Sequence, residues 1–389
     1  MRVAFIKRKS RPAGGGERYL TALLAALAPR GWELTVIGER WDQLPPGAAF
    51  VELAVGGRGR LGYLGFARAV ARHLQQASYD AVVSLDRTVG QDIYRAGEGI
   101  HREWLDRRRR FERSPAAWWS RLSPMQRRLL ARERACLESS RWIAVNSQMV
   151  GRDVARHFPR LAGRVRLVRN GVDLDRFRPA AGWHEAQQIR RGLGLPPDAP
   201  LLAFVGSGFR RKGLQAVLSL VQVLPQIHTA VLGADRWQPW QQRAVAFGVA
   251  ERVHPIAAGT PVEQLLRAAE LFVLPTLFDP CSNATLEALA CGLPVVTTVF
   301  NGAAELIARP VQGVALARPD DGRGLQLAVR ELLPTALALR EDAAGRAEVR
   351  EAVAELAATG AAARMAELIE EAARARRDSV RPGGSPLAG

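Results

Sequence analysis

The sequence has few residues that could form covalent or metal cross-links. It contains three cysteines, Cys136, Cys281 and Cys291, with no CxxC pair and no histidine cluster near them. A disulfide framework or a zinc site is therefore not expected. The 48% hydrophobic and 24% charged content is that of a globular protein held together by an apolar core.

The sequence also lacks a long apolar run. No window offers about 18 uninterrupted apolar residues, which a membrane-spanning helix requires. The first residues, MRVAFIKRKS, hold only a short apolar stretch before a basic cluster, whereas a signal peptide has a longer apolar region after its charges. We therefore expect a first β-strand here, no membrane crossing and a cytoplasmic protein.

Acidic residues are fewer than basic ones: 38 Asp and Glu stand against 55 Lys and Arg, for a net charge of +17. Such an excess predicts an anionic partner, either nucleic acid or an anionic membrane surface. Arginine richness is also common in high-GC genomes, so the excess alone does not identify the partner.

Predicted strands and helices alternate in two successive series. The first begins with a strand at 3–6, a glycine-rich loop, a helix at 17–30 and a strand at 33–37. The second begins with a strand at 201–205 and a helix at 214–224. This order predicts an α/β fold of two Rossmann-like, doubly wound domains that face each other across a cleft.

The predicted boundaries follow from this alternation and from the composition of the connecting segments. They are an N-terminal domain at 1–178, a linker with a short helix at 179–199, a C-terminal domain at 200–345, a helical region at 346–377 and a disordered tail at 378–389.

The stretch LFVLPTLFDPCSNATLEALACGLPVVTT, at 271–298, predicts a buried strand, a turn, a helix and a second buried strand. The helix is expected to start near Ser282 or Asn283, which are both good N-cap types. Asp279 and Glu287 should lie on the same side of this crevice, beside a helix N-terminus that favours anions. The pair suits sugar or ribose hydroxyls, and the alternative is an ordinary βαβ unit with surface acids.

The segment GSGFRRKG, at 206–213, lies between a predicted strand and a predicted helix. Its glycines allow a close backbone approach, and Arg211 and Lys212 could neutralise a diphosphate. It is not a Walker loop, because no Ser or Thr follows Lys212 at the required spacing. Two solvated cations explain this segment alone equally well, but the same sheet edge should carry Asp279 and Glu287, which favours a nucleotide-diphosphate site.

Residues 102–134 combine eleven arginines and four acids with interleaved aromatic residues. This composition is typical of contact with an anionic leaflet. A solvated helical face is the second interpretation and RNA binding the third, since no RNA-binding fold signature occurs. The residues assigned to the membrane contact are Trp104, Arg107, Arg108, Arg109, Arg110, Trp118 and Trp119.

Two further features are weaker candidates. Gly14-Gly15-Gly16 precedes a helix and could let backbone amides approach a phosphate, or could form only a tight turn. His101 follows Gly97-Glu98-Gly99 near the predicted cleft, where we count it as a catalytic candidate, although a lone histidine more often serves packing.

Three segments together resemble glycosyltransferase family 4, a family of retaining enzymes with the GT-B fold. They are NGVDLDRF at 170–177, VGSGFRRKG at 205–213 and the stretch at 271–298. Within the family, the chain is most similar to the lipopolysaccharide core glucosyltransferases, whose GGxxR loop, GSxFxRKG loop and basic–aromatic segment have counterparts here. The resemblance covers nearly the whole chain.

The resemblance implies a nucleotide-sugar substrate held mainly by the C-terminal domain at 200–345, with no cofactor and no metal ion. It also implies that the N-terminal domain at 1–178 binds the acceptor and that the helical region at 346–377 packs back on this domain. It places Arg211 and Lys212 at the departing diphosphate and Glu287 at the donor ribose. The other donor-binding residues that it implies are Gly15, Gly16, Arg18, Gly206, Ser207, Asp279, Asn283 and Ala284. Two positions depart from the family pattern: Asp279 replaces the first Glu of its Glu-x7-Glu motif, and Ser207 stands where many members have Arg.

These features predict a metal-independent hexosyltransferase that uses UDP-glucose or a related UDP-sugar. Its expected acceptor is a lipid-linked glycan, the lipopolysaccharide core, at the inner face of the cell membrane. The alternatives are a capsule or exopolysaccharide acceptor, or an inactive basic membrane- or RNA-binding protein on the same scaffold.

Overall fold

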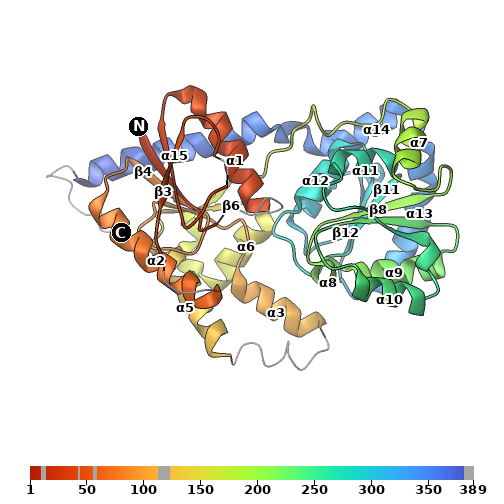
Figure 1. Ribbon diagram of the computed structural model, residues 1–389, viewed down its shortest axis with the longest axis horizontal. Helices are drawn as coiled ribbons and strands as arrows, with labels where there is room; N and C mark the ends of the chain where they lie inside the picture. Colours follow the sequence, from red (N-terminus) through yellow and green to blue (C-terminus); the bar gives the residue numbers. More distant parts are fainter. Residues whose placement is uncertain (10–14, 43, 56–58, 113–122, 381–389) are drawn as a thin grey trace. The chain divides into compact units, whose positions relative to one another are not determined.

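The chain forms two compact units, each built around a parallel β-sheet (Figure 1). The computed structural model describes residues 1–9, 15–42, 44–55, 59–112 and 123–380. Unit 1 comprises residues 1–106, 114–170 and 358–389, and unit 2 comprises residues 107–113 and 171–357. Two parallel α/β domains confirm the predicted fold class.

The described sheet of unit 1 has seven strands in the order β3-β2-β1-β4-β5-β6-β7, and all its pairings are parallel. The strands are β1 (Arg2–Ile6), β2 (Glu33–Gly38), β3 (Ala48–Glu52), β4 (Ala81–Ser84), β5 (Ile93–Arg95), β6 (Trp142–Val145) and β7 (Val165–Leu167). The helices are α1 (Gly15–Leu27), η1 (Ala28–Arg30), α2 (Gly59–Gln76), α3 (His101–Phe111), α5 (Pro124–Ser139), α6 (Gln148–His157), η3 (Pro159–Arg164) and α15 (Ala358–Val380). The residues of α3 from Arg107 onward belong to unit 2.

The first strand shows how the sheet of unit 1 is covered on both faces. Successive side chains of a strand point to opposite faces. Val3 and Phe5 join a core cluster with residues of α1 and α15, whereas Ala4 and Ile6 pack with Phe66 of α2. The last helix of the chain therefore completes the core that the first residues begin, and Figure 1 shows α15 beside α1 and β4.

The described sheet of unit 2 has six parallel strands in the order β10-β9-β8-β11-β12-β13. The strands are β8 (Leu201–Val205), β9 (His228–Leu232), β10 (Val253–Pro255), β11 (Leu271–Leu274), β12 (Val295–Thr298) and β13 (Gly313–Leu316). The helices are α7 (Trp183–Gly192), α8 (Phe209–Lys212), α9 (Leu214–Val223), α10 (Gln238–Ala246), η4 (Ala250–Arg252), α11 (Val262–Ala268), α12 (Asn283–Ala290), η5 (Gly302–Leu306), η6 (Pro310–Gln312), α13 (Gly322–Ala338), α14 (Ala343–Arg350) and η7 (Glu351–Leu356).

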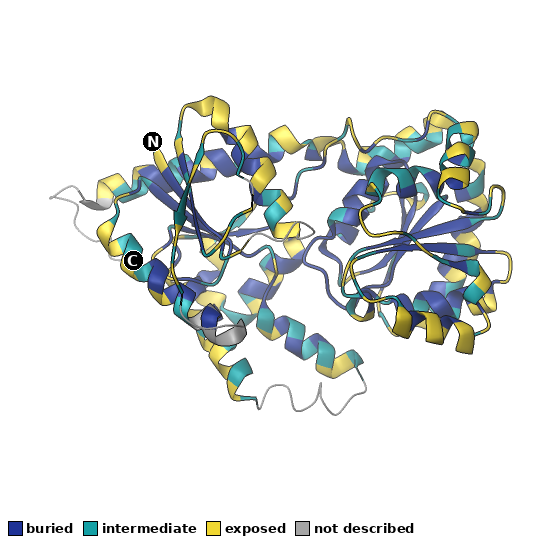
Figure 2. Ribbon diagram, viewed as in Figure 1, coloured by how far each residue is buried: buried dark blue, intermediate teal, exposed yellow. Residues whose placement is uncertain are grey.

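The central strands of unit 2 match the apolar runs of the sequence. Strands β8, β11 and β12 are buried at every position, as expected for a parallel sheet covered on both faces. Figure 2 shows the same division, with dark blue strands inside each unit and yellow outer faces on many helices.

A buried ion pair anchors α7 to this sheet. Arg190 is fully buried, and its guanidinium donates to the carboxylate of Glu270, which is 4% exposed. Arg190 Nε also donates to Ala268 O at 2.7 Å, and Glu270 Oε2 accepts from Leu201 N at 2.7 Å. These bonds join α7 to the residues that precede β8 and β11.

The structure corrects three predictions about boundaries. Segment 179–199, predicted as a linker, belongs to unit 2 because α7 is anchored there by Arg190. Of the region 346–377, only the part from Ala358 onward belongs to unit 1. Helix α15 continues to Val380, and the remaining tail residues lie outside the described part of the chain. In addition, the short strands β5 and β13 were not predicted.

Among the described helices, none has both the length and the apolar character that a membrane crossing requires.

Replacing Arg190 with Met should lower the free energy of unfolding by about 3–5 kcal/mol, because Glu270 would remain buried without its main partner. Chemical denaturation followed by circular dichroism measures this change. Arg191→Met, an exposed position on the same helix, is the control, with an expected change within about 0.5 kcal/mol. Equal effects of the two substitutions would contradict the anchoring role.

Candidate active site

Two loops of unit 2 carry most of the predicted donor residues. The loop after β8 leads into α8 with Arg211 and Lys212, and the loop after β11 carries Asp279 before α12. Strands β8 and β11 are neighbours in the sheet. Because carboxyl ends of parallel strands share one edge, the two loops meet there, where ligands bind in folds of this type.

Lys212 and Asp279 form a buried ion pair between these loops. Lys212 Nζ donates to Asp279 Oδ2, and both residues are 7% exposed. Arg211 Nη1 lies 3.7 Å from the same carboxylate and donates to Phe278 O at 2.6 Å. Burial acts to raise the pKa of Asp279, but the charges of Lys212 and Arg211 outweigh it and hold the pKa below its ordinary value. The site therefore contains a carboxylate and two cations.

Two glycines allow the loops to come this close. Gly206 has φ +135°, and a Cβ there would lie 3.1 Å from Lys212 Cε. Gly213 has φ +88°, and a Cβ there would lie 2.3 Å from Pro275 O. A side chain at Gly213 would therefore push apart the segments that bring Lys212 to Asp279.

Asp235, which was not predicted as a site residue, accepts hydrogen bonds from two backbone amides of the glycine-rich loop. Its carboxylate accepts from Gly208 N at 2.6 Å and from Phe209 N at 3.3 Å. The hydroxyl of Ser207 accepts from Ala234 N at 3.1 Å. The amides of Gly208 and Phe209 are thus already bonded, so the positive charge of the loop comes from its side chains.

Asn301, also missed from the sequence, fixes the start of α12 to the end of β12. Its Oδ1 accepts from Ser282 N and Ala303 N, both at 3.1 Å. Its Nδ2 donates to Thr285 Oγ1 at 2.9 Å and Thr297 Oγ1 at 3.1 Å. Ser282 is the N-cap, as predicted, and accepts from Thr285 N. A polar residue three positions after the end of a buried parallel strand was the available signal.

Glu287 lies on the second turn of α12 and is 7% exposed. The pKa of Arg176 is raised, first by its hydrogen bond to Glu263 and then by the charges of Glu263 and Glu287. Asn283 and Ala284 form the first turn of α12, whose amides have no acceptor within the helix. Arg176 belongs to the NGVDLDRF motif. This motif therefore lies near Glu287, the residue predicted to bind the donor ribose.

The glycine loop of unit 1 adjoins a buried lysine that was not predicted. Gly15 and Gly16 open α1 and are exposed, as is Arg18. Lys7 Nζ lies 3.4 Å from Asp86 Oδ1, and a Cβ at Gly16 would be 3.6 Å from this Nζ. Burial acts to lower the pKa of Lys7, but nearby carboxylates, first Asp86, raise it above its ordinary value. A cation therefore lies beneath the start of α1.

His101 lies in unit 1 at the start of α3, and its described bonds are internal to that unit. Its backbone N–H donates to Glu133 Oε1 at 2.6 Å, and its ring Nε2 lies 2.6 Å from Gln126 Oε1. These bonds tie α3 to α5. The catalytic assignment of His101 stays a prediction.

The predicted membrane residues differ in their exposure. Arg107 is buried, which corrects its assignment, because a cation inside the protein cannot reach lipid headgroups. Arg108 pairs with Glu112 at 3.0 Å, whereas Arg109 and Arg110 are exposed.

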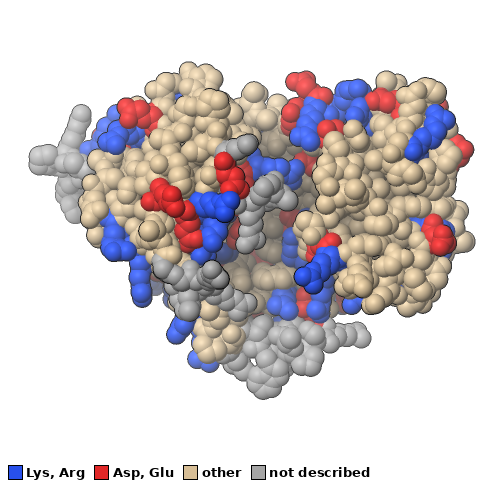
Figure 3. Space-filling model, in the orientation of Figure 1, with Lys and Arg blue, Asp and Glu red and all other residues tan. Residues whose placement is uncertain are grey.

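The aromatic part of the membrane prediction is only partly described. Trp104 is half-buried on α3, and Trp118 and Trp119 lie outside the described residues. On the face drawn in Figure 3, basic side chains are spread over the surface and several have acidic neighbours. The exposed Arg109 and Arg110 on α3 are therefore the part of the predicted membrane contact that can be tested directly.

One group among the described residues has the composition of a metal site. Glu103, Asp106 and His157 place their ligand atoms within 4.8 Å of one another. His157 Nε2 is 2.8 Å from Glu103, and Arg156 Nη1 lies 3.3 Å from the same carboxylate. An arginine at the group competes with a cation, and the group belongs to unit 1. The prediction of a metal-independent reaction stays a prediction.

Known protein families match both halves of the chain. "Glycosyltransferase Family 4" matches residues 13–176, and "Glycosyl transferases group 1" matches residues 199–335. The chain is a glycosyltransferase whose first half matches family 4. The second match contains the whole Lys212–Asp279 site, so this site lies within the region that family members share.

Curated glycosyltransferases match the chain at moderate identity. The lipopolysaccharide glucosyltransferase WaaG of Escherichia coli is 27% identical over 364 residues, which cover 90% of this chain and 95% of that protein. The D-inositol 3-phosphate glycosyltransferase of Salinispora arenicola is 31% identical over 205 residues, which cover 48% of this chain and 46% of that protein.

Solved glycosyltransferases share the fold. The crystal structure of WaaG superposes with a TM-score of 0.81 at 24% identity and covers 94% of this chain and 99% of its own. HepE of Anabaena, solved in complex with UDP-glucose, superposes with a TM-score of 0.73 at 16% identity and covers 95% of this chain and 100% of its own.

The Lys212–Asp279 pair makes the stability of this glycosyltransferase depend on pH. Because the folded pKa of Asp279 is below its unfolded value of about 3.9, the pair stabilises the fold above that pH and loses its effect as pH falls through the folded pKa. The unfolding free energies of wild type and Asp279→Asn should differ most above about pH 5 and converge below about pH 4.

Urea denaturation between pH 3 and pH 7 measures this convergence. Asp175→Asn, at an exposed position, is the control and should stay close to wild type throughout. A constant difference between wild type and Asp279→Asn would show that the charge of Asp279 does not stabilise the fold.

Proposed function

We propose that this glycosyltransferase moves a hexose from a UDP-sugar, with UDP-glucose as the first candidate, to a hydroxyl of a lipid-linked glycan, with the lipopolysaccharide core as the first candidate. The observation that carries the proposal is the buried Lys212–Asp279 pair with Arg211 at the carboxyl edge of the unit 2 sheet. The relation to WaaG over 90% of the chain supports the acceptor class, and the UDP-glucose complex of HepE supports the donor class.

The charges of the site fit the departure of a nucleoside diphosphate. When the bond between the anomeric carbon and the diphosphate breaks, negative charge develops on the β-phosphate, and Arg211 and Lys212 stabilise it. The acceptor hydroxyl attacks the cation-like sugar carbon from the same face, and its proton passes to the departing phosphate oxygen. The configuration is retained, and no protein nucleophile or metal ion is required in this scheme.

Asp279 holds Lys212 in place before the donor binds. Lys212 Nζ donates to the Asp279 carboxylate, so the lysine side chain is oriented by a fixed acceptor. Aspartate is one methylene shorter than the glutamate of the family pattern, so its reach toward sugar hydroxyls differs, and this position bears on the choice of donor.

Lys212→Ala should lower sugar transfer by at least about 100-fold, because the developing charge loses a fixed cation. Glu287→Ala should also abolish transfer, through the loss of donor binding. The assay is release of UDP from UDP-glucose in the presence of a lipid-linked acceptor. Arg236→Ala, an exposed cation in the same unit, should retain activity.

Thermal unfolding of each variant shows whether the fold is kept. Wild-type transfer rates in both Lys212→Ala and Glu287→Ala would contradict the assignment of the donor site. Screening UDP-, GDP- and ADP-sugars with the wild type identifies the donor, and lack of affinity for all of them in calorimetry would favour an inactive scaffold instead.

We also propose that the protein works at the inner face of the cell membrane, where the exposed Arg109 and Arg110 contact anionic lipid. Each cation near such a surface contributes about 1 kcal/mol. The double variant Arg109→Ser, Arg110→Ser should therefore bind anionic liposomes about 30-fold more weakly in sedimentation assays.

A matched double variant on α13, Arg323→Ser with Arg330→Ser, changes the net charge equally at exposed positions and should bind like wild type. Binding should also fall as salt is raised, because exposed charges are screened. Equal binding of the wild type to neutral and anionic vesicles would count against the proposal.

A further inference from the structure

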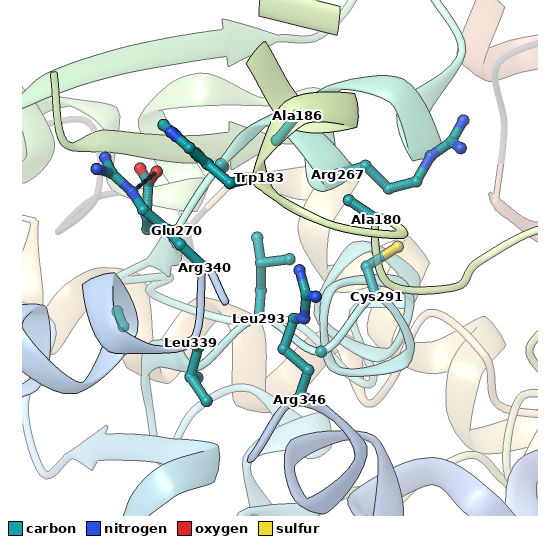
Figure 4. Close-up of a pocket in the computed structure, with 13 residues that line it drawn as sticks. Ala180, Trp183, Ala186, Arg267, Glu270, Cys291, Leu293, Leu339, Arg340 and Arg346 are labelled. Carbon is teal, nitrogen blue, oxygen red and sulfur yellow. Dashed lines mark hydrogen bonds and ion pairs between the residues drawn. The ribbon is translucent and has the colours of Figure 1, made fainter. Parts of the chain in front are cut away.

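Unit 2 has a second cavity at the opposite edge of its sheet. Its walls come from Glu270 and Leu293, which precede β11 and β12, and from Trp183, Arg340 and Arg346 on the surrounding helices (Figure 4). The donor residues follow the carboxyl ends of the same strands, so the cavity and the Lys212 site lie at opposite ends of β11. The cavity is therefore separate from the site described above.

The cavity contains an arginine whose charge is not balanced. Arg346 Nε is buried, and among the described residues it has no hydrogen-bond partner. No ion pair of Arg346 occurs within that part of the chain either. In Figure 4 its guanidinium points into the cavity, toward Leu293 and Cys291. A buried N–H group without an acceptor costs about 1–3 kcal/mol, and more when it is charged, so this position calls for an acceptor.

The neighbouring arginines of the cavity are already paired. Arg340 Nε donates to Glu270 Oε1 at 2.8 Å, and Arg267 Nη1 donates to Glu185 Oε1 at 2.6 Å. In Figure 4 the Arg340 guanidinium lies next to Glu270, and the Arg267 guanidinium points away from the centre of the cavity. The unsatisfied donor inside the cavity is therefore that of Arg346, in a lining with three arginines and a single acid.

The backbone of the cavity wall cannot supply the missing acceptor easily. Gly292, with φ +72°, packs directly against α14, and a Cβ there would lie 2.9 Å from Arg346 Cβ. The nearby carbonyl of Ala290 already accepts from Arg350 Nη1 at 2.7 Å. The close packing at Gly292 fixes the stem of Arg346 while its head faces the open space.

The size and chemistry of the cavity suit a small oxyanion. Its volume is about 30 Å³, and since about 10–15 Å³ holds one water molecule, there is room for two oxygen atoms, such as those of one carboxylate or two of the oxygens of a phosphate group. Guanidinium binds phosphate and carboxylate through paired N–H donors. We propose that this cavity is an anion-binding site, in which Arg346 holds the phosphate or carboxylate group of a small ligand.

Binding of inorganic phosphate and of acetate tests the proposal, with sodium chloride keeping the ionic strength constant. At a hundredfold excess over Kd, the binding anion should raise the Tm of the wild type by about 5 °C in a saturable way. Arg346→Gln keeps a polar side chain but should abolish the rise. Arg318→Gln, at an exposed position of the same unit, should retain it.

Phosphate could also bind at the donor site, so Lys212→Ala is a second arm of the experiment. The rise should persist in Lys212→Ala and should disappear only in Arg346→Gln. A rise that is lost in Lys212→Ala and kept in Arg346→Gln would overturn the proposal, as would the absence of a saturable rise with either anion.

The comparison of phosphate with acetate identifies the group that binds. Sugar transfer by Arg346→Gln without added anion should equal that of the wild type, because Arg346 is not at the donor site. This result keeps the test independent of the proposed function, since the anion response is read from thermal stability and not from turnover.

Discussion

The buried ion pair between Lys212 and Asp279 is the constraint on which the donor site depends. A buried lysine and a buried aspartate are each unfavourable alone and stable only in contact. Their contact fixes the distance between the loops after β8 and β11, and it requires glycine at position 213, where a Cβ would collide with Pro275 O. The loop geometry and the charge of the site thus follow from one interaction.

The parts of the fold that could be predicted are those with a strong local pattern. Strands β8, β11 and β12 begin and end at the predicted residues, because each is an apolar run that is buried on both faces. Strand β5 has three residues and β13 contains an exposed valine, so neither gives a clear apolar run. The place of α7 in unit 2 depends on Arg190 meeting Glu270, 80 residues away in the sequence, which no local pattern reveals.

The candidate site shows the same division between local and distant information. The carboxyl ends of parallel strands meet at one edge of a sheet, and this was enough to place Arg211, Lys212 and Asp279 together. It could not show that Asp279 would pair with Lys212 instead of standing free beside Glu287, since the pairing depends on side-chain directions. It also could not show that Asp235 would take two amides of the glycine loop, because that residue comes from a third strand connection.

The two edges of the unit 2 sheet differ in how their buried cations are balanced. At the carboxyl edge, Asp279 neutralises Lys212, so the fold is stable before a donor arrives. At the amino edge, Glu270 balances Arg190 and Arg340, and Arg346 is left with a buried, unsatisfied Nε–H. In this sheet the buried Lys212 and Arg190 each have a carboxylate partner, whereas the half-buried Arg346 has none among the described residues. This difference favours an acceptor for Arg346 that comes from outside the chain.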